Sequence, residues 1–283
     1  MICTELYNGQ GLGNQLWLYA VTRSKALDLG VDFGIMHPER FKGLHFLNLD
    51  FGKQVFGGVG PEGGPPENLP DQIHHYYREP IARHPRTGQD ISKVDPNFYE
   101  IKDFTKIDGN LQSPIYIKHR KSEISKWFTP WQFEAEYEAP QLECIVNFRG
   151  GEYRTMKDVF LPKSYWASAR EVMLKMEPEL TFKVVTDDPK LASKYFPKDE
   201  IKIQDMSHDY LNILKAQYLI LSNSSFGWFP AWINESSRMT IAPKYWWGFN
   251  NAEYWSTGSI FTPEFNYLDR HGNLDPFETQ SEV

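Results

Sequence analysis

The sequence predicts an α/β fold built on parallel, Rossmann-like sheets. Short β-branched and apolar runs alternate with segments of helix length along most of the chain, which is the pattern of successive βαβ units. With 283 residues, the chain is long enough for two domains of ordinary size. Pro130 and Pro140 flank an acidic stretch between two patterned regions, so we expect a first domain at 1–140 and a second at 141–283.

The first half of the chain contains one clear β-loop-α unit. An apolar run leads into a glycine-rich loop and then into a helix that Gly30 is placed to end, since glycine readily adopts the left-handed conformation found after helices. The expected elements, in order, are a strand at 2–7, a helix at about 14–29, a strand at 31–35, a glycine- and proline-rich loop at 51–71 and a helix at 113–128.

The second half alternates strands and helices without interruption. The expected strands are 142–148, 181–186, 201–204 and 218–222, and the expected helices are 162–176, 189–195, 208–217 and 226–234. In an open parallel sheet, ligands bind outside the carboxyl ends of the strands. The loops that follow these strands are therefore the first places to look for functional residues.

Composition and charge disfavour several classes of function. Hydrophobic residues make up 41% of the chain, and its apolar runs fall far short of the roughly 20 residues that cross a bilayer, so no membrane span is expected. The formal charge of −7 repels polyanions, so nucleic acid is not an expected partner. The first residues lack the features of a secretory signal, which predicts a cytoplasmic protein. Cys3 and Cys144 fall in predicted strands as core thiols, and no Cys/His spacing suggests a metal site.

Arg149 follows the expected strand at 142–148, in a turn that Gly150 and Gly151 leave open. Its guanidinium is a planar fork of donors that can hold phosphate oxygens bidentately, although an arginine after a strand can also be a salt-bridged surface residue. Glu152 has two interpretations. It could take the proton of an acceptor hydroxyl, or it could orient Arg149 by a salt bridge.

Two adjacent carboxylates, Asp187 and Asp188, follow the expected strand at 181–186. Either could cap the next helix. A carboxylate is also the natural acceptor for two parallel donors, and guanine offers N1–H and N2–H₂ side by side, whereas uracil and adenine do not.

A third polar segment ends the expected strand at 218–222 and opens a helix. Its hydroxyls and exposed amides could bind a diphosphate, or its side chains could be ordinary helix caps. The segment consists of Ser222, Asn223, Ser224 and Ser225.

The glycine loop near the amino terminus could approach an anion or a sugar hydroxyl with its backbone N–H groups. The alternative is a tight strand-to-helix turn. Its spacing is G-x-G-x-G, without the Lys-Ser/Thr of a phosphate loop, and Asp32 follows too soon to be the ribose-binding acid of a dinucleotide site. An NAD-dependent oxidoreductase is therefore a weaker hypothesis.

Taken together, these segments resemble the α-1,2-fucosyltransferases, with looser similarity to the α-1,6-fucosyltransferases. The six segments occur in the family order between residues 9 and 244. Residues 11–15 resemble G-L-G-N-Q, 109–113 resemble G-x-x-Q-S, 147–153 resemble H-x-R-R-x-D-Y, 185–189 resemble T-D-D-P, 222–232 resemble S-N-S-x-F-S-W-W-x-A-W, and 241–244 resemble I-A-P-K.

The resemblance implies a metal-independent, inverting glycosyltransferase with a GT-B-like fold, in which two Rossmann-like domains face a cleft. It implies that Arg149 grips the diphosphate of GDP-fucose, that Asp187 or Asp188 reads guanine, and that Ser224 and Ser225 support the phosphates. The donor is a substrate, so no cofactor is expected. The implied donor-binding residues are Asn147, Arg149, Asp187, Asp188, Ser222, Asn223, Ser224 and Ser225. The implied acceptor-side residues of the cleft are Gly11, Gly13, Asn14, Gln15 and Gln112.

Three positions depart from the arginine motif of the family. Asn147 replaces its histidine, Gly150 its second arginine and Glu152 its aspartate. A charge-assisted hydrogen bond of the lost kind is worth roughly 1.5 to 3 kcal/mol. The leading hypothesis is transfer of fucose from GDP-β-L-fucose to a hydroxyl of an acceptor sugar, with galactose and an α-1,2 linkage expected. The alternatives are another nucleotide-sugar donor on the same scaffold and a carbohydrate-binding relative without catalysis.

Overall fold

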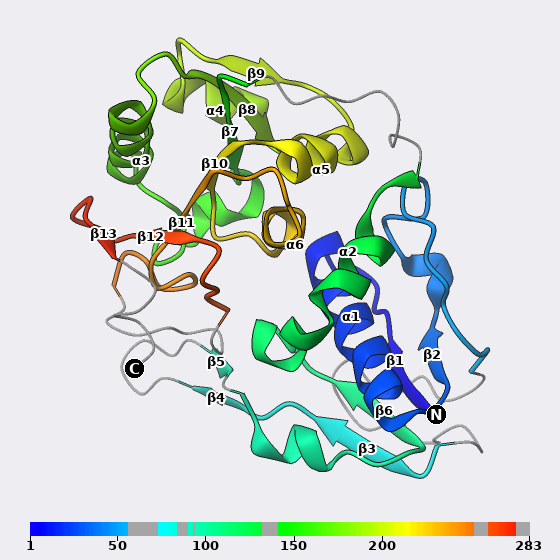
Figure 1. Ribbon diagram of the computed structural model, residues 1–283. Helices are drawn as coiled ribbons and strands as arrows, with labels where there is room; N and C mark the ends of the chain where they lie inside the picture. Colours follow the sequence, from blue (N-terminus) through cyan, green and yellow to red (C-terminus); the bar gives the residue numbers. More distant parts are fainter. Residues whose placement is uncertain (56–72, 84–89, 93, 132–140, 252–259, 276–283) are drawn as a thin grey trace. The chain divides into compact units, whose positions relative to one another are not determined.

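The computed structural model describes residues 1–55, 73–83, 90–92, 94–131, 141–251 and 260–275 (Figure 1). The described residues cluster into two compact units. The first contains those within 1–129 together with Ile260, and the second contains those within 130–251 and 261–275. The junction expected near residue 140 falls in 132–140, outside the described residues, as does most of the loop expected at 51–71. None of the described helices is long and apolar enough to cross a membrane.

The first unit is built on a four-stranded parallel sheet with the strand order β2-β1-β6-β3. A separate antiparallel pair joins β4 and β5. The strands are β1 (Ile2–Glu5), β2 (Phe33–Met36), β3 (His75–Arg78), β4 (Ile81–Arg83), β5 (Asp90–Ser92) and β6 (Thr105–Asp108). The helices are α1 (Leu12–Leu29) and α2 (Lys121–Phe128), with 3₁₀ turns η1 (Pro38–Arg40), η2 (Pro96–Glu100), η3 (Pro114–Tyr116) and η4 (Lys118–Arg120).

Helix α1 packs on β1 and β2 and buries almost all of its first half. Tyr19 lies edge-on to Phe33 and Phe51, with ring centroids 6.1 and 6.2 Å away. Gly30 ends the helix in the left-handed conformation, at φ 67° and ψ 33°, as the sequence predicted. The helix begins at Leu12 rather than near residue 14, so it includes Gly13, Asn14 and Gln15.

In the first unit one expected helix was wrong, and two strands were not predicted. The helix expected at 113–128 is two 3₁₀ turns followed by the short α2, because the backbone leaves helical geometry at Ile117 (φ −131°, ψ −9°) and again at Arg120 (φ −116°, ψ 21°). The sequence did not predict β3 and β6. Both strands contain charged residues, so they lack the continuous apolar run by which buried parallel strands are recognised in a sequence.

The second unit is built on a seven-stranded sheet with the order β13-β12-β11-β10-β7-β8-β9. All neighbours are parallel except β12 and β13. The strands are β7 (Glu143–Phe148), β8 (Thr181–Thr186), β9 (Glu200–Lys202), β10 (Tyr218–Leu221), β11 (Met239–Pro243), β12 (Asn266–Leu268) and β13 (Leu274–Asp275). The helices are α3 (Lys163–Met176), α4 (Pro189–Tyr195), α5 (Met206–Lys215) and α6 (Ser225–Trp232), with the 3₁₀ turn η6 (Gly151–Thr155).

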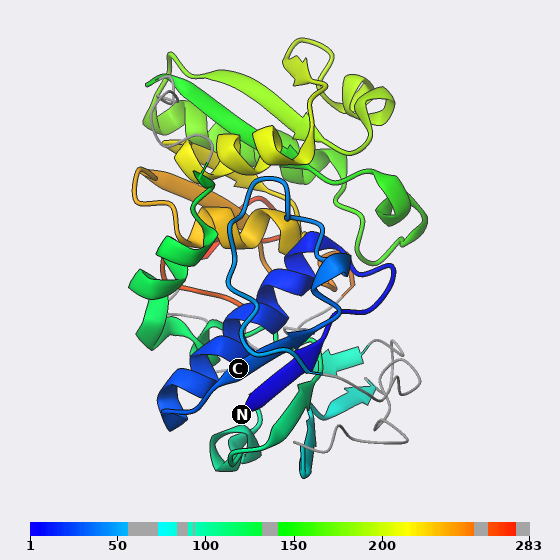
Figure 2. The same cartoon turned by 90° about the vertical axis from the view of Figure 1, so that its right-hand side faces the viewer.

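Helices cover both faces of this sheet (Figures 1 and 2). Alternate residues of β7, including Val146 and Phe148, pack with Trp166 of α3 and Phe196 after α4 in one aromatic core. Helix α5 contacts β7 and β8, and α6 contacts β10. The predicted α/β fold is confirmed: the chain forms two sheets whose central strands are parallel.

Each sheet has a topological switch point, where successive connections leave in opposite directions. In the first unit it lies between β1 and β6, and in the second between β7 and β10. Ligands of open α/β sheets bind in the crevice at the carboxyl ends of such strands. The predicted site residues lie at or near these strand ends: Arg149 follows β7, Asp187 and Asp188 follow the neighbouring β8, Ser222 to Ser224 follow β10, and Gln112 lies in the loop after β6.

Candidate functional site

Arg149 lies directly after β7 at the switch point of the second unit and is about one-third exposed. Its Nη1 is 2.6 Å from Asp187 Oδ2, and its Nη2 is 3.3 Å from Glu152 Oε1. The guanidinium carbon also lies 5.4 Å from the ring centroid of Tyr153. Two carboxylates and an aromatic ring therefore orient the fork, while Nε donates to none of the described residues.

The turn after Arg149 leaves no room for side chains. A β-carbon on Gly151, which has φ +28°, would lie 2.4 Å from Asp187 Oδ2. A β-carbon on Gly150 would lie 2.7 Å from the β-carbon of Asp188 and 3.3 Å from Leu191. Gly150 occupies the position of the second arginine in the family motif, and the packing explains why no arginine stands there.

The two aspartates after β8 have different partners. Asp187 Oδ1 accepts the Gly150 N–H at 2.9 Å, while its Oδ2 pairs with Arg149. Asp188 Oδ1 accepts the Leu191 N–H at 3.0 Å and caps α4. The helix-cap interpretation therefore applies to Asp188. Each carboxylate oxygen has a second lone pair, so guanine recognition by one of the two stays a prediction.

The segment after β10 crosses the switch point to β7. Ser222 Oγ donates to Asn147 Oδ1 at 3.1 Å, and Asn223 Nδ2 donates to the carbonyl oxygens of Val159 and Trp246, both at 2.8 Å. These side chains are buried and shape the loop. Ser224 differs from them: it precedes α6 but its side chain makes no cap hydrogen bond. Its hydroxyl and the first N–H groups of α6, which begins at Ser225, form the part of this segment best suited to an anion.

Glu152 and Tyr153 flank the arginine from the turn η6. The Glu152 side chain is 73% exposed and touches Arg149, as the orienting interpretation expected. Tyr153 is held by a T-shaped contact with Trp247 at 5.6 Å, and burial raises the pKa of its phenol to about 12. Tyr153 was not among the predicted donor-binding residues, although it belongs to the same motif.

Sequence reasoning missed Asp209 in the first turn of α5. Burial raises the pKa of this carboxyl group to about 7, and the nearby negative charges of Asp205 and Asp187 add to the effect. The Gln204 side chain donates to it at 2.9 Å. A carboxyl group with a pKa this high, under the influence of Asp187, is a candidate member of the site. No local motif marks it.

The predicted residues of the first unit divide into two groups. Gln112 Nε2 donates to Asn14 Oδ1 at 2.9 Å, which joins the loop after β6 to the start of α1 across the switch point. Gln15 is 1% exposed and has a structural role, since its amide binds the Arg40 carbonyl and the Lys42 N–H, each at 2.9 Å. Gly11 is the N-cap residue of α1, and Gly13 is buried in its first turn.

Among the described residues, no group of three or more His, Cys, Asp and Glu side chains could hold a metal ion. Cys3 and Cys144 are buried thiols in β1 and β7, as expected, and burial raises the pKa of Cys3 to about 12.

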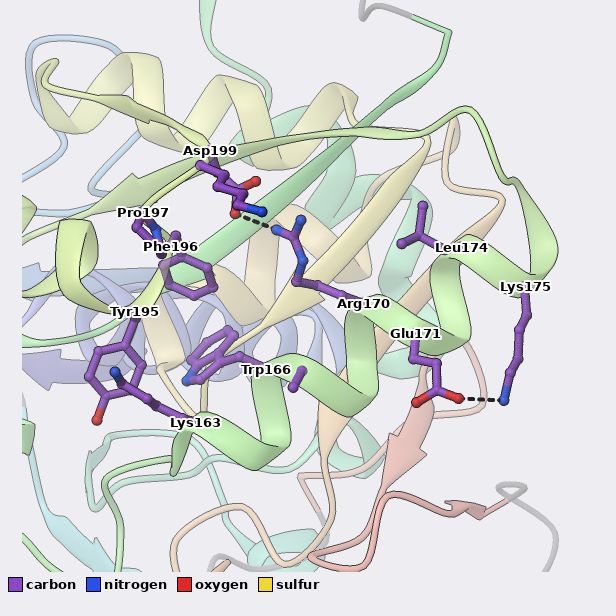
Figure 3. Close-up of a pocket in the computed structure, with 12 residues that line it drawn as sticks. Lys163, Trp166, Arg170, Glu171, Leu174, Lys175, Tyr195, Phe196, Pro197 and Asp199 are labelled. Carbon is purple, nitrogen blue, oxygen red and sulfur yellow. Dashed lines mark hydrogen bonds and ion pairs between the residues drawn. The ribbon is translucent and has the colours of Figure 1, made fainter.

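A groove of about 670 Å³ lies elsewhere in the second unit, between α3 and the segment 195–199 (Figure 3). None of the predicted site residues lines it. Four of its charged side chains form ion pairs within the groove, Arg170 with Asp199 and Glu171 with Lys175, and its ring Trp166 belongs to the core. The candidate site is therefore the strand-end cluster around Arg149 and not this groove.

Comparisons with known proteins identify sugar transferases. No family model matches the chain. An α-1,2-colitosyltransferase of Escherichia coli is 26% identical over 158 residues, which cover 49% of this chain and 54% of that protein. The match therefore spans about half the length of this curated relative. The expected resemblance is confirmed as a distant similarity to a transferase of this kind.

Three solved structures match the chain at low similarity. FUT1 of Arabidopsis thaliana, a variant in complex with GDP, has a TM-score of 0.45 at 10% identity, covering 85% of this chain and 69% of that one. The E. coli heptosyltransferase WaaC with ADP has a TM-score of 0.43 at 10% identity, covering 86% and 87%. POFUT1 in complex with GDP-fucose has a TM-score of 0.44 at 11% identity, covering 85% and 96%.

Proposed function

We propose that the chain is a glycosyltransferase that moves fucose from GDP-β-L-fucose to a hydroxyl of an acceptor sugar, with inversion at the anomeric carbon. One observation carries the proposal. Arg149 stands at the switch point between β7 and β10, where Asp187 and Glu152 orient its guanidinium. A guanidinium held in this way is preorganised to bind the diphosphate of a nucleotide sugar.

The chemistry needs a group that stabilises the departing diphosphate. Negative charge develops on the leaving oxygen as its bond to the anomeric carbon breaks, and a fixed guanidinium can stabilise that charge without a metal ion. The Ser224 hydroxyl and the amino end of α6 would add neutral donors to the phosphates. In this proposal Asp187 and Glu152 hold Arg149 in place, and Asp187 or Asp188 also recognises guanine.

The identity of the sugars rests on the motif order and on the named relative. Five segments follow the order of the α-1,2-fucosyltransferases, a sixth at 185–189 resembles their α-1,6 relatives, and the E. coli relative transfers colitose by name. We assign the acceptor, with galactose as its expected sugar and an α-1,2 linkage, to the first unit, where Asn14 and Gln112 meet at the switch point. The second unit would hold the donor.

A nucleotide panel tests the donor class. A ligand that binds only the folded state raises its stability by mass action, so GDP should raise the melting temperature more than UDP, ADP or NAD at equal concentration. Preference for UDP or ADP would contradict the guanine assignment, and a response to NAD alone would favour an oxidoreductase.

Turnover tests the transfer itself. Lactose supplies a terminal galactose, and NMR of the product with GDP-fucose should show an α-1,2 linkage. GDP should be released at the same rate with EDTA as with Mn²⁺. Activity that disappears with the chelator and returns with Mn²⁺ would contradict metal independence. Glycan binding without GDP release would instead identify a carbohydrate-binding protein.

A further inference from the structure

A buried cluster of charges lies at the switch point of the first unit. Glu5 at the end of β1 and Lys106 on β6 are 0% exposed, and Asp108 at the end of β6 is 2% exposed. Lys106 Nζ lies 2.8 Å from Glu5 Oε2 and 3.4 Å from Asp108 Oδ2. Parallel strands are normally apolar where they are buried on both faces, so three charged groups here are costly and need a reason.

Two tyrosines donate to the carboxylate of Asp108. Tyr7 Oη lies 3.0 Å from Asp108 Oδ1, and Tyr76 Oη lies 2.9 Å from Oδ2. Burial raises the pKa of both phenols well above the ordinary value, so both remain protonated at neutral pH. A phenol has a single proton, and here that proton points to Asp108. Lys106 Nζ also donates to Tyr7 Oη, at 3.4 Å. Toward a ligand, each Oη can therefore only accept a hydrogen bond, and Tyr7 Oη does so beside the Lys106 ammonium.

The two tyrosines differ in position. Tyr7 follows β1 and leads into the glycine loop, and the Asn14–Gln112 pair lies across the same switch point. Tyr76 lies on β3, at the edge of the sheet. Only Tyr7 combines an acceptor oxygen with the place where an open sheet binds its ligand.

Glu5 is a second sign that the cluster is a functional site. Its Oε1 is buried and accepts no hydrogen bond from the described residues. The nearest cationic groups, His37 Nε2 and Arg40 Nη1, lie at 3.7 and 3.8 Å, beyond hydrogen-bond range. A buried carboxylate oxygen left in this state costs about 1 to 3 kcal/mol. A buried group left unsatisfied calls for an explanation, and a catalytic role is one of those that apply.

We propose that Tyr7 and Asp108 form a proton relay for the acceptor sugar. The acceptor hydroxyl gives its proton to Tyr7 Oη as the phenol proton passes to Asp108 Oδ1. The freed oxygen bonds to the anomeric carbon of the donor, and the bond from that carbon to GDP breaks, with the electron pair leaving on the phosphate oxygen. Tyr7 touches the substrate, and Asp108 acts through Tyr7. The relay rests on the proposed transferase function.

The relay implies a pH dependence. Burial raises the pKa of Asp108, and activity should fall as the pH drops through that pKa, because a protonated carboxyl cannot take another proton. Lys106 and the phenols that donate to Asp108 oppose the shift. The titratable and charged groups around Asp108 include Lys106 on β6, Cys3 and Glu5 on β1, Tyr7 in the loop after β1, Tyr76 and Arg78 on β3, and Glu79 directly after β3.

A pair of matched variants separates the relay from a structural role. Tyr7→Phe and Tyr76→Phe each remove one phenol hydroxyl from Asp108. With GDP-fucose and lactose, Tyr7→Phe should lower kcat by about 100-fold or more, as expected for loss of proton transfer, and Tyr76→Phe by less than about tenfold. GDP affinity should be unchanged in both, since the nucleotide site lies in the second unit. Equal losses in the two variants would overturn the relay.

The pH profile supplies the second test. Asp108→Asn keeps the shape and one acceptor oxygen but cannot take a proton. It should lower kcat as far as Tyr7→Phe does and remove the acidic limb of kcat/KM, and the double variant should be no slower than either one. Glu152→Gln should retain that limb. If it loses the limb instead, the base is Glu152 and the relay is wrong.

The outcomes also distinguish failure of the relay from failure of the proposed transferase function. If the wild-type protein releases GDP from GDP-fucose and both Tyr7→Phe and Asp108→Asn are as active as wild type, the transferase function stands and the relay is wrong. A wild-type protein that binds GDP but never transfers fucose would overturn both. If Asp108→Asn does not fold, the comparison of the two tyrosine variants decides.

Discussion

Asp187 Oδ2 lies 2.6 Å from Arg149 Nη1, so a carboxylate after β8 holds the guanidinium that follows β7. The same carboxylate accepts the Gly150 N–H through its other oxygen. One side chain thus connects two neighbouring strand ends and fixes both the turn and the arginine. The candidate site is an assembled unit in which the direction of the fork depends on Asp187.

Arg149→Lys should lower kcat/KM for GDP-fucose by about 100-fold or more while the fold persists. Lysine keeps the charge but loses the planar fork that meets a diphosphate bidentately. Release of GDP measures the loss, and circular dichroism checks the fold. Arg154→Lys is the matched control, since Arg154 is 64% exposed and lies 3.8 Å from Asp188. Similar losses in the two variants would show that Arg149 has no special role.

Substitutions of Asp187 and Asp188 should have different effects: the first should lower turnover and the second should lower stability. Asp187→Asn keeps an oxygen for the Gly150 N–H but removes the charge that holds Arg149, so turnover should fall by about tenfold or more with little change in Tm. Asp188→Ala removes the cap of α4 and should cost about 1 kcal/mol, or about 2 to 4 °C in Tm, with a smaller effect on turnover. GDP release and a thermal melt measure the two effects. The reverse pattern would reassign the two aspartates.

Gly150→Ala should destabilise the protein by about 1 to 3 kcal/mol, because the added carbon would meet the Asp188 β-carbon at 2.7 Å in a packed turn. Gly11→Ala serves as the control, since a β-carbon there has no neighbour within 4 Å. Urea unfolding of the two variants gives the comparison. A stable Gly150→Ala protein would show that the turn can move aside, and the missing second arginine would need another reason.

Asp209→Asn should stabilise the protein more at pH 8 than at pH 5. Burial raises the pKa of Asp209 to about 7 from its ordinary value of 3.8, so the folded state holds its proton more tightly than the unfolded state. The stability that this proton provides is complete below the unfolded pKa and is lost as pH rises to about 7. Asparagine does not titrate and avoids the loss.

The gain in unfolding free energy from Asp209→Asn should be larger at pH 8 than at pH 5 by on the order of 1 to 2 kcal/mol, after allowance for solvent screening near a half-buried group. Urea unfolding at pH 5, 6, 7 and 8 measures it. Asp205→Asn is a useful comparison, since hydrogen bonds from Ser207 and His208 lower the pKa of that exposed carboxyl. A constant difference between Asp209→Asn and wild type across this range would contradict the raised pKa.

The second unit was predicted well because its local signals agree. Strand β8 and helix α4 have the predicted bounds: an apolar run ends at Thr186, Asp188 caps the helix, and Pro189 occupies its first position. Such signals act within a few residues and need no knowledge of the fold. The rule that strand ends carry ligands then located Arg149 without any contact being known.

The first unit was harder to predict because its polar residues are buried by tertiary structure. Lys106 and Asp108 have the composition of a surface turn, yet they belong to a central parallel strand. Their partners cannot be found locally, since Tyr7 is 101 residues from Asp108 in sequence. In the second unit, nothing local marked Asp209 for the same reason.

The close approach of α6 to the end of β7 has a consequence for protein engineering. A β-carbon on Gly227 would lie 2.6 Å from Asn147 Oδ1. Two departures from the fucosyltransferase motifs, asparagine for histidine at 147 and glycine for serine at 227, therefore touch each other in space. Introducing the motif residue at one position alone would place it against a neighbour that fits the present residue. Variants that carry the motif histidine and serine should exchange the two positions together.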